Sequence, residues 1–290
     1  MKVLVIGGTR FFGVHLVRSL LRDGHQVTIA TRGDSKDEFG DCIERIRVDR
    51  TDEIALQKEL KNLHYDVVCD NIAYSSRDVK YLLEAVRCDR YILTSSVSVY
   101  PSLGLDTKEE DFDALNYPLV WCSREDYSYN EIKRQAECAL FQEYPVLSSA
   151  AVRFPYVIGE DDYTKRLYYY VEHIQKEIPM NVDNPREAIS FIRSSEAGDF
   201  LAWIAGSGLR GPVNACSKGT ITLEEIFDYV EEKTGKKPIL DHDAEAAPYS
   251  SGEAFSLNTR KAIEAGFSFT ELDDWIYKLL DYYINVAENN

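Results

Sequence analysis

Tyr129 and Lys133 are four residues apart, a spacing that places both side chains on one face of a helix. A cationic lysine beside a tyrosine favours the phenolate, so we expect Lys133 to lower the pKa of Tyr129 towards neutrality. Ser96 ends a predicted strand over 91–96, and its hydroxyl can hydrogen-bond a substrate oxygen while a proton moves. These three residues predict proton transfer, with Tyr129 as the acid or base. Because this tyrosine–lysine spacing is common, its weight depends on the elements around it.

Residues 2–13 are typical of a strand, a glycine turn and the start of a helix. Gly7 and Gly8 allow the backbone to approach a ligand, and Gly13 allows the helix to pack tightly on the strand. The helix N-terminus directs free N–H groups at a pyrophosphate, so the turn predicts a dinucleotide site. Arg10 occupies the place of a middle glycine in G-x-x-G-x-x-G, which leaves an ordinary turn that binds nothing as the alternative. The N-terminal position, between a clear strand and a clear helix, favours the cofactor site.

The second predicted strand, 26–31, is followed by Arg32. An acidic residue at this point binds the adenosine ribose, whereas an arginine accommodates a 2′-phosphate. Arg32 and Arg10 therefore favour NADP, and Asp34 keeps NAD open as the alternative. Asp49 follows the third predicted strand, where its carboxylate either accepts from an adenine amino group or caps the next helix.

Strands alternate with helices through the first half of the chain. The predicted strands are 2–6, 26–31, 44–48, 66–70 and 91–96, with helices over 51–63 and 77–86 between the later ones. This alternation predicts an α/β fold with a doubly wound parallel sheet and helices on both faces. We expect a nucleotide-binding domain over 1–158, completed by 189–216, and a small substrate lobe with a C-terminal helix over 159–188 and 217–290.

The lobe is predicted from helical patterns and breaks between them. We expect helices over 165–176, 223–234 and 272–286, with Gly235 as a C-cap, an edge strand over 236–240 and a loop over 241–253. Whether the acidic stretch 241–253 acts as a lid stays open.

Composition restricts the possible partners. The chain has 290 residues, 44% hydrophobic and 28% charged, and no run of the roughly 18 apolar residues that a membrane span needs. Its first predicted strand begins at Lys2, so we expect no presequence, and its six cysteines are scattered singly, as reduced thiols are. We therefore expect a cytoplasmic protein. A net charge of −16 disfavours binding to nucleic acid, and a homodimer stays open.

Several segments carry a family resemblance that spans nearly the whole chain: the turn 7–13, Asp49, the segment 71–73, the Ser96, Tyr129 and Lys133 trio, the segment 153–159, and the tail segments 211–214 and 222–226. The sequence resembles the short-chain dehydrogenase/reductase superfamily, and within it the extended type that contains NAD-dependent epimerases and dehydratases. Arginine at position 10 is similar to an atypical branch that includes chloroplast stem-loop-binding proteins.

The resemblance implies a Rossmann domain with catalytic Ser96, Tyr129 and Lys133. The cofactor contacts that we expect are Gly7, Gly8, Thr9, Arg10, Phe11, Phe12, Gly13, Arg32, Asp49, Arg50, Asn71, Ile72, Ala73, Thr94, Tyr129 and Lys133. The expected substrate contacts are Ser98, Arg153 and Tyr156, and no metal site is expected.

The chain departs from the family pattern at one position that concerns substrate binding. Sugar-nucleotide epimerases use an arginine where this chain has Ile189, and Arg186, Arg193 or Arg153 are the substitutes within reach. The resemblance implies an NAD(P)-dependent oxidoreductase, epimerase or dehydratase that acts at an oxygen-bearing carbon of a small molecule, with sugar nucleotides as one candidate class. The alternative is a non-catalytic NAD(P)-binding regulatory or RNA-associated protein on the same scaffold.

Overall fold

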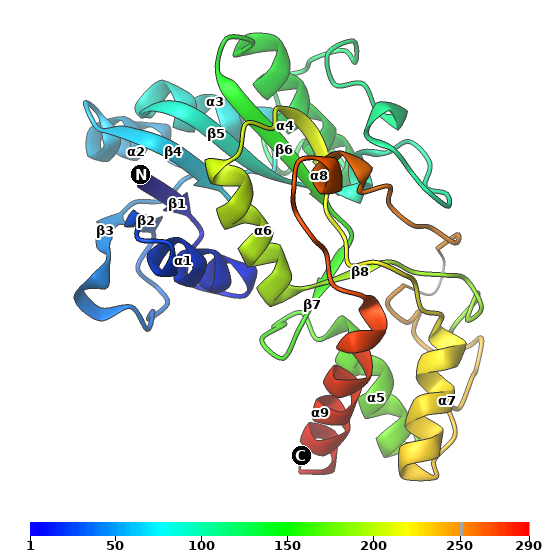
Figure 1. Cartoon of the computed structure of the whole chain (residues 1–290). Helices are drawn as coiled ribbons and strands as arrows, with labels where there is room; N and C mark the ends of the chain where they lie inside the picture. Colours follow the sequence, from blue (N-terminus) through cyan, green and yellow to red (C-terminus); the bar gives the residue numbers. More distant parts are fainter. Residues whose placement is uncertain (250–251, 290) are drawn as a thin grey trace.

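A parallel β-sheet forms the centre of the molecule (Figure 1). The computed structural model describes residues 1–249 and 252–289, and within them this sheet has seven strands. In the order in which they lie side by side, the strands are β3 (Glu44–Arg47), β2 (Gln26–Thr31), β1 (Lys2–Ile6), β4 (His64–Asp70), β5 (Arg87–Ser96), β6 (Ser148–Phe154) and β9 (Gly211–Asn214). The chain builds outwards from β1 to β3 and then returns to β4, so ligands are expected at the carboxyl ends of β1 and β4. The predicted doubly wound parallel sheet is confirmed.

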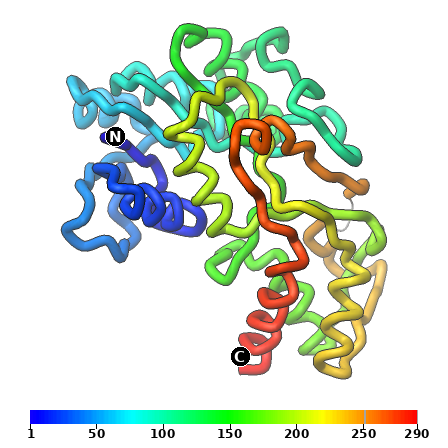
Figure 2. Tube along the Cα trace, viewed as in Figure 1, coloured from blue at the N-terminus to red at the C-terminus, as the bar shows by residue number. Residues whose placement is uncertain are grey.

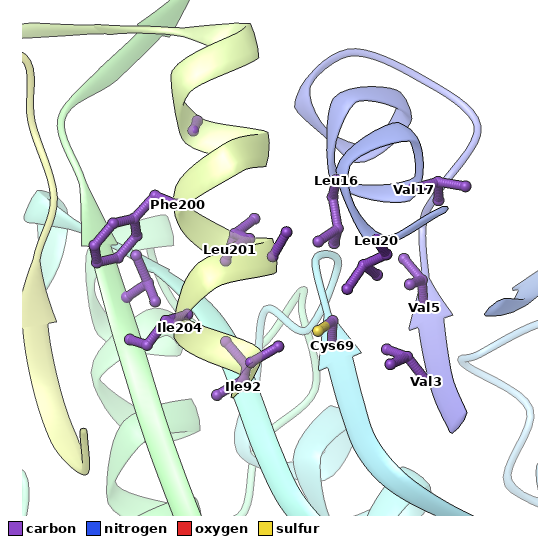
Figure 3. Close-up of a cluster of buried hydrophobic side chains, with 14 of the residues drawn as sticks. Val3, Val5, Leu16, Val17, Leu20, Cys69, Ile92, Phe200, Leu201 and Ile204 are labelled. Atoms are coloured by element: carbon purple, nitrogen blue, oxygen red, sulfur yellow. The ribbon is translucent and has the colours of Figure 1, made fainter. Parts of the chain in front are cut away.

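Strand β1 is buried on both faces, which explains its nearly unbroken apolar sequence. Val3 and Val5 belong to a hydrophobic layer between the sheet and one pair of helices. Leu20 and Leu201 belong to the same layer, which Figure 3 shows. These two helices are α1 (Phe12–Arg22) and α6 (Ser194–Gly206). The alternation of β1 side chains therefore fixes which face these helices cover.

Leu4 and Ile6 point to the opposite face of the sheet. The helices on that face are α2 (Glu53–Leu60), α3 (Ser76–Ala85) and α4 (Tyr129–Glu143). The side chain of Asp52 caps α2 by accepting from an N–H of its first turn, and Ser75 does the same for α3 within a capping box. These caps fix the helix starts near the carboxyl ends of the strands, where the predicted site lies.

Strand β9 forms one edge of the sheet, and side chains close that edge. Pro212 has no N–H to offer, and Lys261 of the short helix α8 (Arg260–Glu264) donates its Nζ to the Pro212 carbonyl at 2.6 Å. The Asn214 N–H donates to Glu109 Oε1 at 2.9 Å. Further pairing along this edge is thereby blocked.

A second, smaller group of elements, mostly helices, forms a lobe that lies below the sheet in Figure 1. Its elements are β7 (Tyr156–Ile158), α5 (Arg166–Lys176), β8 (Phe191–Arg193), α7 (Leu223–Thr234) and α9 (Ile276–Glu288). Strands β7 and β8 pair in parallel, and the helices share a core of their own. The trace in Figure 2 enters the lobe after β6, returns through α6 and β9, and ends in the lobe. The predicted domain limits follow this path but stay a prediction.

Short 3-10 turns complete the fold: η1 (Gly40–Cys42), η2 (Val97–Val99), η3 (Glu109–Asp111) and η4 (Leu272–Asp274). The predicted helix 272–286 therefore begins as a 3-10 turn, before α9. No helix among the described residues is both long and apolar enough to cross a bilayer.

The predicted edge strand 236–240 is wrong. This segment makes only an isolated bridge, between Leu240 and Met180, and Ile239 and Leu240 are 41% and 50% exposed. Its apolar residues suggested a strand, but Pro238 removes a backbone donor and no neighbouring strand among the described residues is available to pair with. Residues 241–249 and 252–253 contain no helix or regular strand, as predicted, while 250–251 lie outside the described residues.

Candidate functional site

The glycine turn after β1 brings the backbone of two elements into contact. A Cβ on Gly13 would lie 2.2 Å from the Gly7 carbonyl oxygen, and one on Gly8 would lie 2.9 Å from Val17. Helix α1 begins directly afterwards, and its first turn contains no acidic side chain. A close backbone turn beneath a free helix N-terminus fits the pyrophosphate of a dinucleotide.

Arg10, in place of the middle glycine, is accommodated by its neighbour. Phe11 takes a positive φ of 53°, with ψ at −142°, directly before α1. The Arg10 side chain donates from Nε to Ser35 Oγ at 3.0 Å. The turn therefore keeps its shape without a glycine at position 10.

A cavity of about 410 Å³ lies at the carboxyl ends of the strands around this turn. It brings together these predicted cofactor residues: Gly7, Thr9, Arg10, Phe11, Phe12, Arg32, Asp49, Arg50, Asn71 and Ile72. A larger cavity, of about 1100 Å³, lies beside β9 and contains none of the predicted site residues. The smaller cavity is the cofactor-site candidate because the glycine turn opens into it.

Charged side chains line the part of the cavity beside β2 and β3. Arg32 pairs with Asp34 at 3.1 Å, with both side chains largely exposed. Asp49 Oδ1 accepts from the N–H and the hydroxyl of Thr51, at 2.9 and 2.7 Å, and these hydrogen bonds lower the pKa of Asp49. Asp49 thus stabilises the turn before α2, while the cap of that helix, the alternative role for Asp49, is supplied by Asp52.

Arg50 lines the cavity, but two carboxylates of the protein already pair with its charge. Its guanidinium is buried and pairs with Asp70 and with Asp78, the latter at 2.7 Å. Attraction to these two carboxylates outweighs burial and raises the pKa of Arg50. Arg50 is therefore part of the cavity wall.

The floor of the site is a hydrogen-bonded chain of predicted residues. Asn71 Nδ2 donates to the Gly7 carbonyl at 3.2 Å, and Thr94 Oγ1 donates to Asn71 Oδ1 at 3.1 Å. Lys133 Nζ donates to the carbonyls of Ala73 and Thr94, at 2.8 and 2.9 Å. Three strand ends and helix α4 are joined in this way beneath the cavity.

Lys133 is 3% exposed, and burial lowers its pKa to about 8. Its Nζ lies 4.8 Å from the centre of the Tyr74 ring. Because two backbone carbonyls accept from the ammonium group, one of its three donors is left for a ligand. The fold holds this lysine in place with the backbone rather than with a carboxylate.

Tyr129 opens α4 and lies next to Ser96 at the end of β5. Burial of its hydroxyl raises the pKa of Tyr129, and a hydrogen bond with Ser96 opposes that shift. The expectation that Lys133 lowers this pKa is not met, because the lysine is turned towards the backbone of β5 and the segment after β4. Tyr129 is thus protonated at neutral pH in this structure.

The predicted substrate residues differ in their surroundings. Ser98 Oγ is buried and has no hydrogen-bond partner among the described residues, and the Tyr156 ring lies 4.3 Å from that of Tyr249. The prediction for Arg153 is wrong. It is 0% exposed and binds Glu137 through Nη2 and Nε at 2.6 and 3.0 Å, so no substrate can reach its guanidinium.

Sequence reasoning missed several cavity residues, among them Tyr74, Arg124 and Tyr163. Arg124 lies 4.7 Å from the Tyr74 ring centre and donates to Asp78 at 3.0 Å, while the Tyr163 ring meets Phe11 edge-on at 5.9 Å. All three come from connecting segments, where no periodic pattern marks a residue as part of a site.

His64, Asp66 and Asp89 are a group of metal-ligand types among the described residues. They lie at the amino ends of β4 and β5, at the opposite edge of the sheet from the glycine turn. His64 Nε2 is 2.9 Å from Asp89 Oδ1, and Asp66 accepts from the Lys2 N–H at 2.7 Å.

The sheet order, the glycine turn and the cavity together define a dinucleotide-binding α/β protein. The model of the NAD dependent epimerase/dehydratase family matches residues 3–187. The chain therefore belongs to the NAD dependent epimerase/dehydratase family, and the resemblance stated from the sequence is confirmed.

Two curated relatives match parts of the chain. The chloroplast stem-loop binding protein of 41 kDa b from Arabidopsis thaliana is 36% identical over 113 residues, which cover 34% of this chain and 30% of that protein. The 2′-dehydrokanamycin reductase of Streptomyces kanamyceticus is 31% identical over 99 residues, which cover 34% and 28%. The matches thus span less than a third of either relative.

Solved structures resemble the whole chain. MoeE5 in complex with UDP-glucuronic acid and NAD has a TM-score of 0.77 at 21% identity, covering 100% of this chain and 99% of the other. The UDP-glucose 4-epimerase of Thermus thermophilus in complex with NAD has a TM-score of 0.72 at 20% identity, covering 98% and 99%. At these identities the likeness supports the fold.

Proposed function

We propose that the protein is an NAD(P)-dependent enzyme that acts at an oxygen-bearing carbon, as an oxidoreductase, epimerase or dehydratase. The observation that carries the proposal is the position of Tyr129, which contacts Ser96 on one side and the cavity residue Tyr74 on the other, with ring centres 6.0 Å apart. A group able to move a proton therefore adjoins the cavity that fits the cofactor.

In the proposed mechanism each of the three residues has a separate task. The nicotinamide, when bound, supplies or accepts the hydride. Tyr129 gives its hydroxyl proton to the substrate oxygen when a carbonyl is reduced, and takes one from it in the reverse direction. Ser96 Oγ orients that oxygen, and the remaining Lys133 donor holds the cofactor ribose. The raised pKa of Tyr129 keeps its hydroxyl protonated, which an acid requires before it donates.

The cofactor that we propose is NADP(H), with NAD(H) as the alternative. Arg10 and Arg32 both line the cavity, and Arg10 has no carboxylate partner among the described residues. Two guanidinium groups at the β2 end of the cavity suit a 2′-phosphate. Arg32 pairs with Asp34, and an acidic residue at this point can accept from the ribose, so NAD stays the alternative cofactor.

The substrate class follows from the relatives only as a proposal. The solved neighbours named above hold UDP-glucuronic acid or are named as a UDP-glucose 4-epimerase, so sugar nucleotides are the first class to test. The position that the resemblance assigns to a diphosphate-binding arginine is Ile189, which is buried and bridges to Ile221. Any anion in the substrate must therefore be bound by another residue.

Replacing Tyr129 with phenylalanine tests the mechanism. Because positioned acid–base groups contribute roughly 10²- to 10⁴-fold, we expect Tyr129→Phe to lower turnover by about that factor and to leave cofactor affinity unchanged. Mass spectrometry of the purified protein identifies the cofactor first. NAD(P)H absorbance then reports net oxidation or reduction of carbonyl and sugar-nucleotide substrates, and product analysis reports epimerisation or dehydration, in which the hydride returns to the substrate. Tyr127→Phe, at a residue that is 50% exposed two positions earlier, is the matched control. Full activity of Tyr129→Phe would refute the proposal.

A further inference from the structure

Arg166 is the first residue of α5 and packs beside two tyrosine rings that contact each other, with ring centres 4.3 Å apart. Its guanidinium carbon lies 5.6 Å from the ring centre of Tyr156 and 5.7 Å from that of Tyr249. Its Nε donates to Thr164 Oγ1 at 3.2 Å. The side chain is half-buried, and the rings and this hydrogen bond set its position while its two terminal nitrogens keep their donors.

No carboxylate of the described chain pairs with Arg166 within 4.0 Å. Other arginines of the lobe have such partners: Arg186 pairs with Glu224 at 3.0 Å, and Arg193 with Glu160 at 3.6 Å. Asp162, close to Arg166 in sequence, accepts from Thr164 instead. A half-buried cation without a partner is costly, and a bound anion would relieve that cost.

The sheet register places this arginine beside the proton-transfer residues. Ser96 pairs with Phe154 across β5 and β6, and Tyr156 follows two residues later. The charge of Arg166 also acts on Tyr129, whose pKa it lowers slightly against the effect of burial. Arg166 therefore lies on the lobe side of Tyr129, near enough for its charge to act on the tyrosine hydroxyl.

We infer that Arg166 binds an oxyanion of the substrate, a phosphate ester or a carboxylate, while the reacting oxygen lies at Tyr129 and Ser96. A guanidinium presents its in-plane donors as a fork, which matches the paired oxygens of either group, and the contacts with the two rings and Thr164 position it. The inference rests on the proposed function and adds to it the substrate class. It gives the anion-binding task to α5, since Ile189 cannot perform it.

Calorimetry on the protein saturated with NADPH tests the inference. The probes are uridine diphosphate, glucose 1-phosphate, glucuronate and, as the neutral control, glucose. Because charge-assisted hydrogen bonds contribute most to such sites, we expect Arg166→Gln to weaken binding of at least one anionic probe about tenfold or more. Glucose and NADPH binding should not change. The probe most affected shows whether the oxyanion is a phosphate or a carboxylate.

Three variants make the outcome decisive. Arg186→Gln, in the same lobe but paired with Glu224, should bind every probe like the unmodified protein. Arg166→Lys keeps the charge but loses the fork, so it should recover only part of the affinity. Tyr129→Phe should keep oxyanion binding while losing turnover, which separates a failure of the proposed mechanism from a failure of this inference. Absence of binding by every anionic probe, or equal binding by Arg166→Gln, overturns the assignment.

Discussion

Lys133 is a charged side chain that the fold buries without a carboxylate partner. Its ammonium group donates to the Ala73 and Thr94 carbonyls, and the charges of Asp70 and Asp78 oppose the effect of burial on its pKa. Burial is the larger effect and lowers that pKa to about 8. The sequence spacing identified this lysine but assigned its effect to Tyr129, because the depth of burial is set by elements distant in the chain.

Replacing Lys133 with methionine should change how stability depends on pH. The pKa of Lys133 is about 8 in the folded protein and 10.5 when unperturbed, so between these values the unfolded chain binds more protons. Stability of the unmodified protein therefore rises with pH across this window, and the full cost of burial, about 3 kcal/mol, is present below it. The difference in unfolding free energy, Lys133→Met minus unmodified, should fall by about that amount from pH 8 to pH 10.5.

Urea unfolding at several pH values measures that difference, because other titrating groups cancel between the two proteins. Lys58→Met, at a side chain that is 79% exposed, is the control and should show no such trend. A constant difference for Lys133→Met across the window would mean that the lysine is not perturbed by burial.

Arg32 allows a separate test of cofactor choice. If its guanidinium binds a 2′-phosphate, Arg32→Ala should weaken NADPH binding roughly tenfold and leave NADH binding unchanged, because only NADPH carries that group. Fluorescence titration with each cofactor measures both affinities. Asp34→Ala distinguishes the alternative, since loss of a ribose acceptor would weaken NADH binding instead. Equal losses for both cofactors in Arg32→Ala would contradict the NADP assignment.

At the scale of elements, the glycine turn was predictable because its geometry excludes side chains. A Cβ at Gly13 would collide with the Gly7 carbonyl, so the residue type itself reports the close approach of α1 to β1. The adjustment at Arg10 was not predictable, because it depends on the φ angle of 53° that Phe11 adopts. Local sequence therefore indicated a close turn suited to a cofactor, and only the backbone explains how it tolerates an arginine.

Elements that depend on distant partners were predicted less well. Arg153 lies on a strand that leads to the substrate side, and its sequence neighbours give no sign that Glu137 of α4 neutralises it. The segment 236–240 has the residues of a strand but, within the described part of the chain, no strand beside it. Tyr74 and Arg124 reach the cavity from loops that only the assembled sheet brings together. In each case the missing information was a contact between segments far apart in sequence.

For the molecule as a whole, charge separates the two candidate functions. A curated relative is named a stem-loop binding protein, but its match covers 34% of this chain and 30% of its own length. The net charge here is −16, and like charges repel a phosphate backbone over distances of about 10 Å at moderate salt. This acidic balance disfavours the RNA-associated function, which also gives the Ser96, Tyr129 and Lys133 arrangement no task.

We therefore expect the purified protein not to retard a stem-loop RNA, even at low ionic strength. Non-specific binding to nucleic acid relies on phosphate contacts and gives dissociation constants of about 10⁻⁴ to 10⁻⁶ M at physiological salt, and an excess of acidic side chains opposes those contacts. Gel mobility with and without NADPH, over a series of salt concentrations, measures this. A mobility shift that weakens steeply as the salt concentration rises would indicate that basic side chains bind the RNA, and would support the RNA-associated function. A gel shift that NADPH abolishes but salt does not would place the RNA at the cofactor cavity. The cavity is lined by the cations Arg10, Arg32 and Arg124, which could contact the RNA there.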